Sequence, residues 1–545
     1  MVHEKDVRVT VRDGIDIGAR IYRPDGDGPF PALFAVSPYR YDNDDLPAYP
    51  LFLWRETGPI AWYVEHGYAY VHADTRGTGF SQGEYGFLDR AEQNDLYDVI
   101  EWIAEQPWCN GKIGGIGQSY YAMTQWWMGI MQPPHLTCIA PYDGLVDPYR
   151  FMGYPGGIEG NFLPYWYAQS VRLPNKFPAN RDHPRTLPRD LPFEFSEHPL
   201  YDAFWQERSA VDRLHEITVP VYSIGVWAKL DLHLRGNMMG YAAARGEKHL
   251  AITGTATAFS SMLDFADVSF HERYLLPFYD RYLKEIANGF ESRSAIEYVV
   301  KNTGDARSAD RWPPPKVRER TLYLDAGPSG SVTSLNDGSL DERPPTDASV
   351  ASTSYSYPDP RWVLGVVAVG PEGPDPVRAV LTFTSPALQD DCELTGSPSA
   401  ILFVSTSGTD TDLVLKLSEQ FAQDAGERAA ARQPRSVIVT KGWLRASHAH
   451  ERDPRHDTPE YAYYMHARVN TLTPGNVYEI VIPLQPIAWR FRRGSRIRFE
   501  VANGDSPVTD GLFFHAYRPD KIGTDTIEHN PGHRSRLVLP MMEVS

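Results

Sequence analysis

Short apolar runs alternate with amphipathic helical segments through the first half of the chain. Residues 31–36, 68–73 and 113–116 are apolar runs of strand length, which predicts three buried β-strands. Residues 95–105 instead carry apolar side chains at helical spacing, namely Leu96, Val99, Ile100 and Ile103. Strands that alternate with helices indicate a largely parallel sheet with helices packed on it.

Further segments extend this pattern at both ends. Residues 6–24 alternate apolar and polar positions around Asp13-Gly14, which predicts an N-terminal hairpin. Apolar runs return at 219–225 and 249–254, and residues 270–284 have the spacing of a helix. We therefore expect the sheet to resume after residue 215.

The hydrophobic pattern changes in two other places. Residues 145–215 are dense in proline, glycine and aromatic residues without a strand repeat, so we predict an inserted cap of short helices. After residue 290 the helical period disappears, and segments such as 400–405 and 477–482 read as strands separated by turns, which is typical of a β-sandwich or jelly roll. The predicted domains are a core over 1–144 and 216–290, a cap over 145–215 and a β-rich domain over 291–545.

Composition and charge narrow the range of partners. The 545-residue chain has a formal net charge of −17, which argues against nucleic acid and anionic membranes. Its first residues lack the apolar core of a signal peptide, and no apolar run is long enough to span a bilayer. The three cysteines are scattered without disulfide or metal-ligand spacing, so we expect a reducing, cytoplasmic location.

The sequence does not favour a metal or another cofactor. The glycine-rich loop 74–83 lacks the spacing of known phosphate-binding loops. The densest group of potential metal ligands lies in the β-rich part with a loop spacing that matches no familiar site: His448, His450, Asp453, His456 and Asp457. We therefore predict chemistry carried by protein groups alone.

The strongest chemical signal is the run Ile113-Gly114-Gly115-Ile116-Gly117-Gln118-Ser119-Tyr120-Tyr121-Ala122. It reads as a buried strand, a sharp turn with Ser119 at its apex, and a helix. The pattern is close to G-x-S-x-G, with Tyr121 in place of the last glycine. Such a turn raises the serine hydroxyl above the sheet and directs the amide of Tyr120 towards an oxyanion formed there. Ser119 is therefore the predicted nucleophile.

These features, together with several motifs elsewhere, resemble the CocE/NonD family of serine hydrolases, which includes esterases, α-amino-acid ester hydrolases and Xaa-Pro dipeptidyl-peptidases. The resemblance implies an α/β-hydrolase core, an inserted helical cap and a C-terminal jelly roll. The motifs that carry it are Ser37-Pro38-Tyr39, Asp74-Thr75-Arg76-Gly77-Thr78-Gly79, Gln106-Pro107-Trp108-Cys109-Asn110-Gly111, Gly117-Gln118-Ser119-Tyr120, Phe278-Tyr279-Asp280-Arg281-Tyr282-Leu283-Lys284, Gly408-Thr409-Asp410-Thr411-Asp412 and Lys441-Gly442-Trp443-Leu444-Arg445-Ala446-Ser447-His448.

The resemblance also implies roles for individual residues. Ser119 matches the family nucleophile, and the oxyanion hole would use the hydroxyl of Tyr39 and the amide of Tyr120. In the family an acid follows the strand equivalent to 219–225, and a histidine follows the strand equivalent to 249–254. Here Asp231 lies slightly beyond the expected acid position, and residues 254–261 contain no histidine.

Three explanations for the missing histidine stay open at this stage. His271 or His233 acts as a displaced base, a histidine near Ala256 or Ala258 has been replaced, or the protein no longer hydrolyses a substrate. We expect a serine hydrolase or acyl-transfer enzyme that cleaves a small ester or amide. The alternative is a catalytically impaired member that binds a ligand in the same pocket.

The cap supplies the predicted substrate-binding residues, which are Phe162, Tyr165 and Trp166. Their aromatic character favours a hydrophobic or aromatic acyl or leaving group. No acidic subsite for a free peptide amino terminus is evident, so esterase activity is favoured over dipeptidyl-peptidase activity. The sequence leaves the oligomeric state open, with a homo-oligomer among the alternatives.

Overall fold

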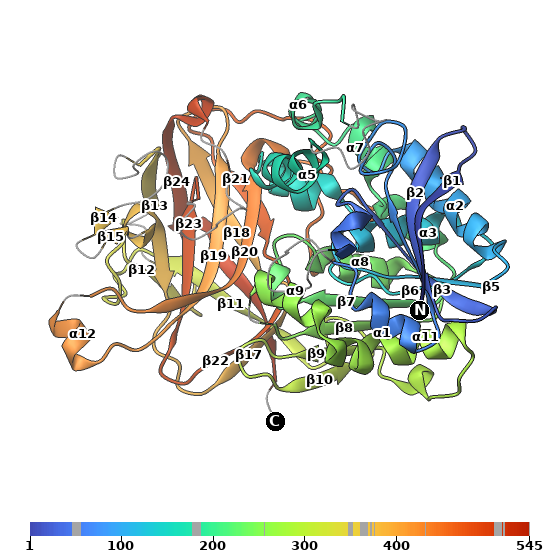
Figure 1. Cartoon of the computed structure of the whole chain (residues 1–545). Helices are drawn as coiled ribbons and strands as arrows, with labels where there is room; N and C mark the ends of the chain where they lie inside the picture. Colours follow the sequence, from blue (N-terminus) through green and yellow to red (C-terminus); the bar gives the residue numbers. More distant parts are fainter. Residues whose placement is uncertain are drawn as a thin grey trace.

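The computed structural model shows a helix-covered sheet beside a second body made mostly of strands (Figure 1). The N-terminal half of the chain, in blue to green, forms the first body, and the C-terminal half, in yellow to red, forms the second. The structure describes residues 1–45, 56–176, 187–255, 257–346, 352–359, 369–370, 373–374, 376–430, 432–505, 515 and 518–543.

The first body is built on a ten-stranded sheet with the order β1-β2-β4-β3-β5-β6-β7-β8-β9-β10. β1 and β2 form the predicted antiparallel hairpin, and the strands from β4 to β9 are joined by parallel pairs. The sheet continues past residue 290 with β9 and β10. The strands are β1 (Val2–Thr10), β2 (Asp16–Arg23), β3 (Phe30–Ser37), β4 (Ala69–Asp74), β5 (Cys109–Gly115), β6 (Leu136–Ile139), β7 (Val221–Val226), β8 (Lys248–Thr253), β9 (Ile296–Val299) and β10 (Ala306–Ala309).

Helices cover this sheet because their sequences supply apolar faces. The helix α2 begins after Asp89, whose side chain accepts a hydrogen bond from the amide of Glu92, and it buries Leu96, Val99 and Ile100. The helix α3 is buried along nearly its whole length, which matches its largely apolar sequence. The principal helices are α1 (Ile60–Glu65), α2 (Arg90–Ala104), α3 (Tyr120–Met131), α8 (Leu234–Ala243), α9 (Ala258–Ala266), α10 (Val268–Phe270) and α11 (Leu276–Leu283).

The cap consists of short helices, as predicted, and Figure 1 draws α5, α6 and α7 in the upper part of the molecule. Buried aromatic rings hold them together, with Trp205 packed against Tyr149 and Phe195. Arg150 ties the cap to the second body because its guanidinium pairs with Asp147 and donates to the carbonyl oxygen of Tyr464. The helices are α4 (Phe162–Trp166), α5 (Leu173–Lys176), α6 (Leu191–Glu197) and α7 (Ala203–Arg208), with the π-helical turns η2 (Tyr149–Gly153) and η4 (Tyr167–Arg172).

The second body is a mostly antiparallel β structure with its own apolar core, which confirms the predicted jelly-roll type of domain. Its fourteen-stranded sheet follows the order β13-β24-β18-β26-β11-β12-β16-β23-β19-β20, with β17, β21, β22 and β25 paired beside this path. A short helix, α12 (Ala425–Ala429), and a small ribbon, β14 (Val369–Gly370) with β15 (Gly373–Pro374), are added to it. The strands are β11 (Val317–Asp325), β12 (Gly338–Asp341), β13 (Ser352–Tyr357), β16 (Leu381–Thr384), β17 (Cys392–Gly396), β18 (Ser399–Thr406), β19 (Asp412–Gln420), β20 (Ser436–Arg445), β21 (Tyr478–Pro483), β22 (Ile487–Phe491), β23 (Arg496–Ala502), β24 (Gly523–Asn530), β25 (His533–Arg534) and β26 (Arg536–Met542).

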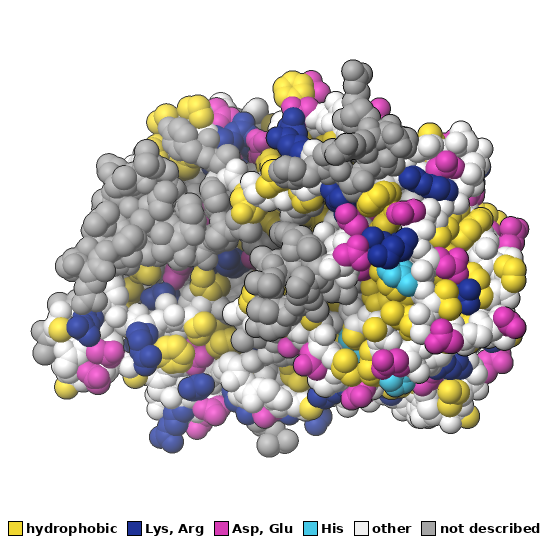
Figure 2. Space-filling model, viewed as in Figure 1, with side chains coloured by type: hydrophobic (Ala, Val, Ile, Leu, Met, Phe, Trp, Pro, Cys, Tyr) yellow, Lys and Arg dark blue, Asp and Glu magenta, His cyan; other side chains and the backbone are white. Residues whose placement is uncertain are grey.

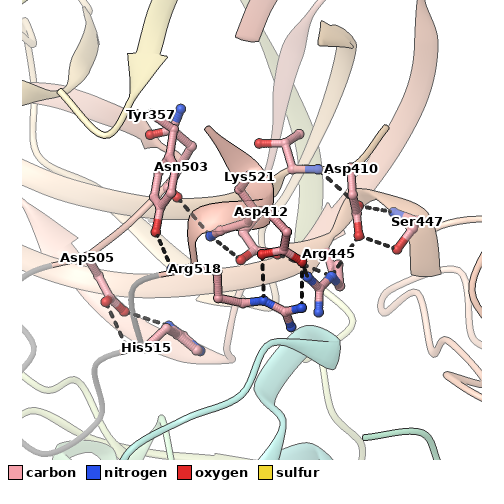
Figure 3. A network of polar contacts seen from close by, with 12 residues as sticks. Tyr357, Asp410, Asp412, Arg445, Ser447, Asn503, Asp505, His515, Arg518 and Lys521 are labelled. Carbon is pink, nitrogen blue, oxygen red and sulfur yellow. Dashed lines mark hydrogen bonds and ion pairs between the residues drawn. The ribbon is translucent and has the colours of Figure 1, made fainter. Parts of the chain in front are cut away.

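The motifs at residues 408–412 and 441–448 meet in a buried polar network (Figure 3). Asp410 accepts hydrogen bonds from Arg445 at 2.8 Å and from the Ser447 hydroxyl at 2.7 Å, and Asp412 pairs with Lys521. Each charge is therefore matched by an opposite charge or a hydrogen-bond donor, as buried ionic groups require. These contacts give the two motifs a structural role in joining strands and loops of the second body.

Figure 2 shows the distribution of charged side chains on one face of the molecule. On the described part of the face in Figure 2, acidic and basic side chains are interspersed. Among the described residues, no helix combines the length and apolar character needed to cross a bilayer.

Candidate active site

Ser119 lies in a strained turn between β5 and α3. Its backbone φ is 62°, in the left-handed region that residues with a Cβ rarely adopt. Gly117 has a φ of 127°, and a Cβ there would lie 2.3 Å from the Cβ of Tyr121. The turn is therefore possible only because a glycine precedes the serine by two residues. This is the geometry of a nucleophile elbow, with Ser119 at the N-terminus of α3.

A cavity of about 220 Å³ opens above this turn. Its wall is mostly apolar and comes from the core, from the cap and from the segments after β7 and β8. The predicted substrate residues Phe162 and Trp166 line it, whereas Tyr165 is 47% exposed and is not among the lining residues. The lining residues are Tyr39, Glu56, Ser119, Tyr120, Met123, Leu145, Met152, Phe162, Trp166, Lys229, Leu232, His233, Ala258, Phe259 and Met262.

Tyr39 lies beside Ser119 at the end of β3. The indole N–H of Trp166 donates to the Tyr39 hydroxyl oxygen at 2.8 Å, which fixes the phenol at the cavity wall. Burial, reinforced by the nearby Glu56, raises the pKa of Tyr39 well above its usual range, so the group stays a hydrogen-bond donor. The Tyr120 phenol points away from this side and donates to Glu92 at 2.8 Å, so only the Tyr120 amide would serve an oxyanion.

His233 is the histidine that the fold brings to the serine. Its Nε2 lies 3.3 Å from the Ser119 Oγ, and its ring sits at the start of α8, where it is 3% exposed. Burial, with the nearby charge of Lys229, lowers the pKa of His233 well below its usual range. A neutral imidazole at this distance can accept the serine proton.

The other two predicted triad partners lie elsewhere, which corrects the expectation for both. The ring nitrogens of His271 are each 2.7 Å from another group, Nδ1 from the Tyr63 hydroxyl and Nε2 from the Phe265 carbonyl oxygen, so His271 is a buried structural residue. Asp231 forms an ion pair with Lys441 of β20 at 3.8 Å. Within the described part of the chain the buried Nδ1 of His233 has no hydrogen-bond partner, so Asp231 does not orient this imidazole.

Two buried charged residues that the sequence did not predict as site residues, Lys229 and Glu56, line the cavity beside Ser119. Lys229 follows β7, near where the family pattern places an acid, and its Nζ lies 3.1 Å from the Asp143 carboxylate. Asp143 also accepts from the Gln118 side chain at 2.9 Å. Glu56 lines the same cavity and is 3% exposed. The only hint of this in the sequence is that a lysine, Lys229, lies in the loop that the family pattern predicts to carry an acid.

The acid-rich and histidine-rich region of the C-terminal half forms ion pairs. Asp212, Asp453 and His456 bring their ligand atoms within 4.8 Å of one another. Arg455 lies between the two carboxylates, at 2.9 Å from Asp212 and 2.6 Å from Asp453. This guanidinium and His456 account for the arrangement without a metal.

Two family models match the chain in consecutive stretches. The model described as X-Pro dipeptidyl-peptidase (S15 family) matches residues 13–256, and the model of the X-Pro dipeptidyl-peptidase C-terminal non-catalytic domain matches residues 288–537. Among curated proteins, the cocaine esterase of Rhodococcus sp. (strain MB1 Bresler) is 26% identical, covering 99% of this chain and 98% of its own.

Solved structures agree along the whole chain. A CocE/NonD family hydrolase from Staphylococcus aureus superposes with a TM-score of 0.82 at 27% identity, covering 99% of this chain and 94% of its own. An α-amino-acid ester hydrolase superposes with a TM-score of 0.75 at 19% identity, covering 99% and 96%, and supports the fold alone.

The fold and these relatives define the class of the protein as a hydrolase of the serine esterase and peptidase type. Within this class, residues 13–256 match the X-Pro dipeptidyl-peptidase (S15 family) domain and residues 288–537 match the X-Pro dipeptidyl-peptidase C-terminal non-catalytic domain. The predicted resemblance to CocE/NonD hydrolases is thereby confirmed.

Proposed function

We propose that this protein is a serine esterase or amidase that cleaves small substrates through an acyl-enzyme on Ser119. The observation that carries the proposal is the 3.3 Å contact between the Ser119 Oγ and the His233 Nε2 in the wall of the cavity. A serine hydroxyl is a weak nucleophile until a base within hydrogen-bond reach removes its proton. His233 supplies that base from a different loop than the family pattern predicts.

The acylation step uses groups that already face one another. His233 takes the proton of Ser119 as the serine oxygen attacks the substrate carbonyl carbon. The Tyr39 hydroxyl and the Tyr120 amide stabilise the oxyanion. Collapse of the tetrahedral intermediate expels the leaving group, and water or another acceptor then releases the acyl group.

The cavity supports an apolar substrate. Met123, Leu145 and Met152 line it with Phe162 and Trp166, and the charge of Lys229 is balanced by Asp143. An acyl group with an aliphatic or aromatic tail would bury its surface against these side chains. Esters and amides of apolar acids are therefore the favoured substrates, ahead of peptides with a charged amino terminus.

The alternative is a silent member that binds a ligand without turnover, because the Nδ1 of His233 has no partner among the described residues. The two are separated by mixing the protein with p-nitrophenyl butyrate and measuring p-nitrophenol release and intact mass. The proposal expects a butyryl adduct on the peptide that contains Ser119, followed by turnover. Release equal to the buffer rate, with no adduct, supports the silent alternative.

Tyr39→Phe is expected to lower kcat roughly 10²–10³-fold, because it removes one oxyanion donor while keeping the ring. The measurement is kcat for p-nitrophenyl butyrate in the variant and in the unmodified protein. Tyr85→Phe is the matched control, since Tyr85 is a buried phenol that donates to the Tyr120 hydroxyl at 3.0 Å and does not line the cavity. A Tyr39→Phe rate within about threefold of the control would assign the oxyanion hole to other donors.

A further inference from the structure

The carboxyl group of Glu56 is buried in the wall of the cavity that contains Ser119, and it takes no part in the proposed acylation steps. The amide of Gln118 donates to the Glu56 carbonyl oxygen at 3.0 Å, so the backbone of Glu56 is fixed against the nucleophile turn. The Glu56 Oε2 is buried and, among the described residues, has no hydrogen-bond partner. Buried polar atoms in native proteins are almost always paired, and the exceptions often have a functional reason.

The groups that face Glu56 come from several elements. Lys229 follows β7, Asp143 follows β6, and Tyr39 follows β3, while Ser119 and Tyr121 come from the turn and helix α3. The positive charge of Lys229 lies 3.1 Å from the Asp143 carboxylate, so it is largely neutralised. Burial consequently dominates and raises the pKa of Glu56 to about 8, against the opposing effect of Lys229. Glu56 therefore carries a proton at neutral pH.

We propose that Glu56 is a second catalytic acid–base group, which protonates the leaving group during acylation and activates water during deacylation. This inference rests on the proposed acyl-enzyme function. In the acyl-enzyme His233 holds the proton it took from Ser119, so a second group must accept the proton of the attacking water.

The proton balance closes over one catalytic cycle. In acylation the Ser119 proton passes to His233, the bond between the carbonyl carbon and the leaving oxygen breaks, and that oxygen takes the Glu56 proton. The site then holds an imidazolium and a carboxylate. In deacylation a water proton passes to Glu56 while the water oxygen bonds to the acyl carbon. The bond from the acyl carbon to Ser119 breaks, and the serine oxygen takes its proton back from His233.

The test is Glu56→Gln, which keeps the size and polarity of the side chain and removes the transferable proton. With p-nitrophenyl butyrate, whose leaving group departs without an acid, the burst of p-nitrophenol should remain at about one equivalent. The steady-state rate should fall by roughly 10²-fold or more, since general acid–base catalysis contributes ~10²–10⁴-fold. Intact mass should show a butyryl-enzyme that accumulates. Ethyl butyrate, whose leaving group needs a proton, should acylate the variant more slowly than the unmodified protein.

Two further variants separate chemistry from structure. Glu56→Asp keeps the acid and should recover part of the deacylation rate. Glu92→Gln is the matched control: burial raises the pKa of Glu92 to about 8 as well, but this carboxyl accepts from the Tyr120 phenol and is not in the cavity wall. Its ratio of burst rate to steady-state rate should match that of the unmodified protein.

The contrary outcomes separate the role of Glu56 from the acyl-enzyme function. Steady-state turnover of Glu56→Gln within about threefold of normal on both esters overturns the role of Glu56. If that variant does not fold, the pH profile of the unmodified protein decides: kcat/KM for ethyl butyrate should fall above a pH of about 8, where Glu56 loses its proton, and a flat profile rejects the proposal. Absence of any acyl-enzyme in the unmodified protein would contradict the proposed function itself.

Discussion

Ser119→Ala is expected to abolish covalent labelling by a fluorophosphonate probe and to lower kcat for p-nitrophenyl butyrate on the order of 10⁴–10⁶-fold. The reason is chemical, because the variant keeps the elbow backbone and loses the atom that forms the acyl-enzyme bond. The measurement combines in-gel labelling with steady-state kinetics, and thermal unfolding shows whether the fold survives. Because Ser119 has a φ of 62°, alanine is no more strained there than serine.

Ser260→Ala serves as the control for this prediction. Ser260 belongs to α9, the helix that contributes Ala258, Phe259 and Met262 to the cavity, and its hydroxyl lies 2.6 Å from that of Thr257. Its removal should leave labelling intact. Labelling that survives in Ser119→Ala would assign the nucleophile to another residue.

His233→Ala is expected to lower kcat/KM by roughly 10³–10⁵-fold, because the 3.3 Å contact that activates Ser119 is lost. The measurement is kcat/KM for p-nitrophenyl butyrate, normalised to folded protein. His271→Ala is the matched control: it removes a buried ring with two hydrogen bonds, so it should reduce thermal stability while leaving kcat/KM per folded molecule nearly unchanged.

The pH dependence of the unmodified protein checks the same assignment. The imidazole accepts a proton only when neutral, and it is neutral above its pKa. Burial and Lys229 lower the pKa of His233 well below 6.5, so the acid limb of kcat/KM should lie well below pH 6.5. If the histidine missing after β8 is not replaced by His233, turnover should instead be low at every pH. Full turnover in His233→Ala, or a strong gain from Ala258→His in the unmodified protein, would favour a lost base.

The local pattern of the sequence was sufficient to predict the fold class and to single out Ser119 as the candidate nucleophile. A strand, a glycine-rich turn and a helix are specified by neighbouring residues, so Ser119 and the approach of the Tyr120 amide follow from about ten consecutive positions. The fold class followed in the same way, because apolar periodicity reports strands and helices and the family motifs report their order. The structure confirms the predicted largely parallel sheet, the helical cap and the β-rich second body.

Which side chains lie beside Ser119 depends on which loops meet in the folded protein. The distance between two residues along the sequence does not predict this. Glu56, Lys229 and His233 lie far from Ser119 in the chain and reach it only because β3, β5 and β7 end at one edge of the sheet. His271 and His233 were equivalent candidates by residue type, but helix packing directs one into the core and the other into the cavity. The sequence by itself determined the candidate nucleophile and the architecture through local periodicity. Only the tertiary structure brought the candidate base and the buried carboxyl to Ser119, since contacts between distant segments set their positions and exclusion of water shifts their pKa values.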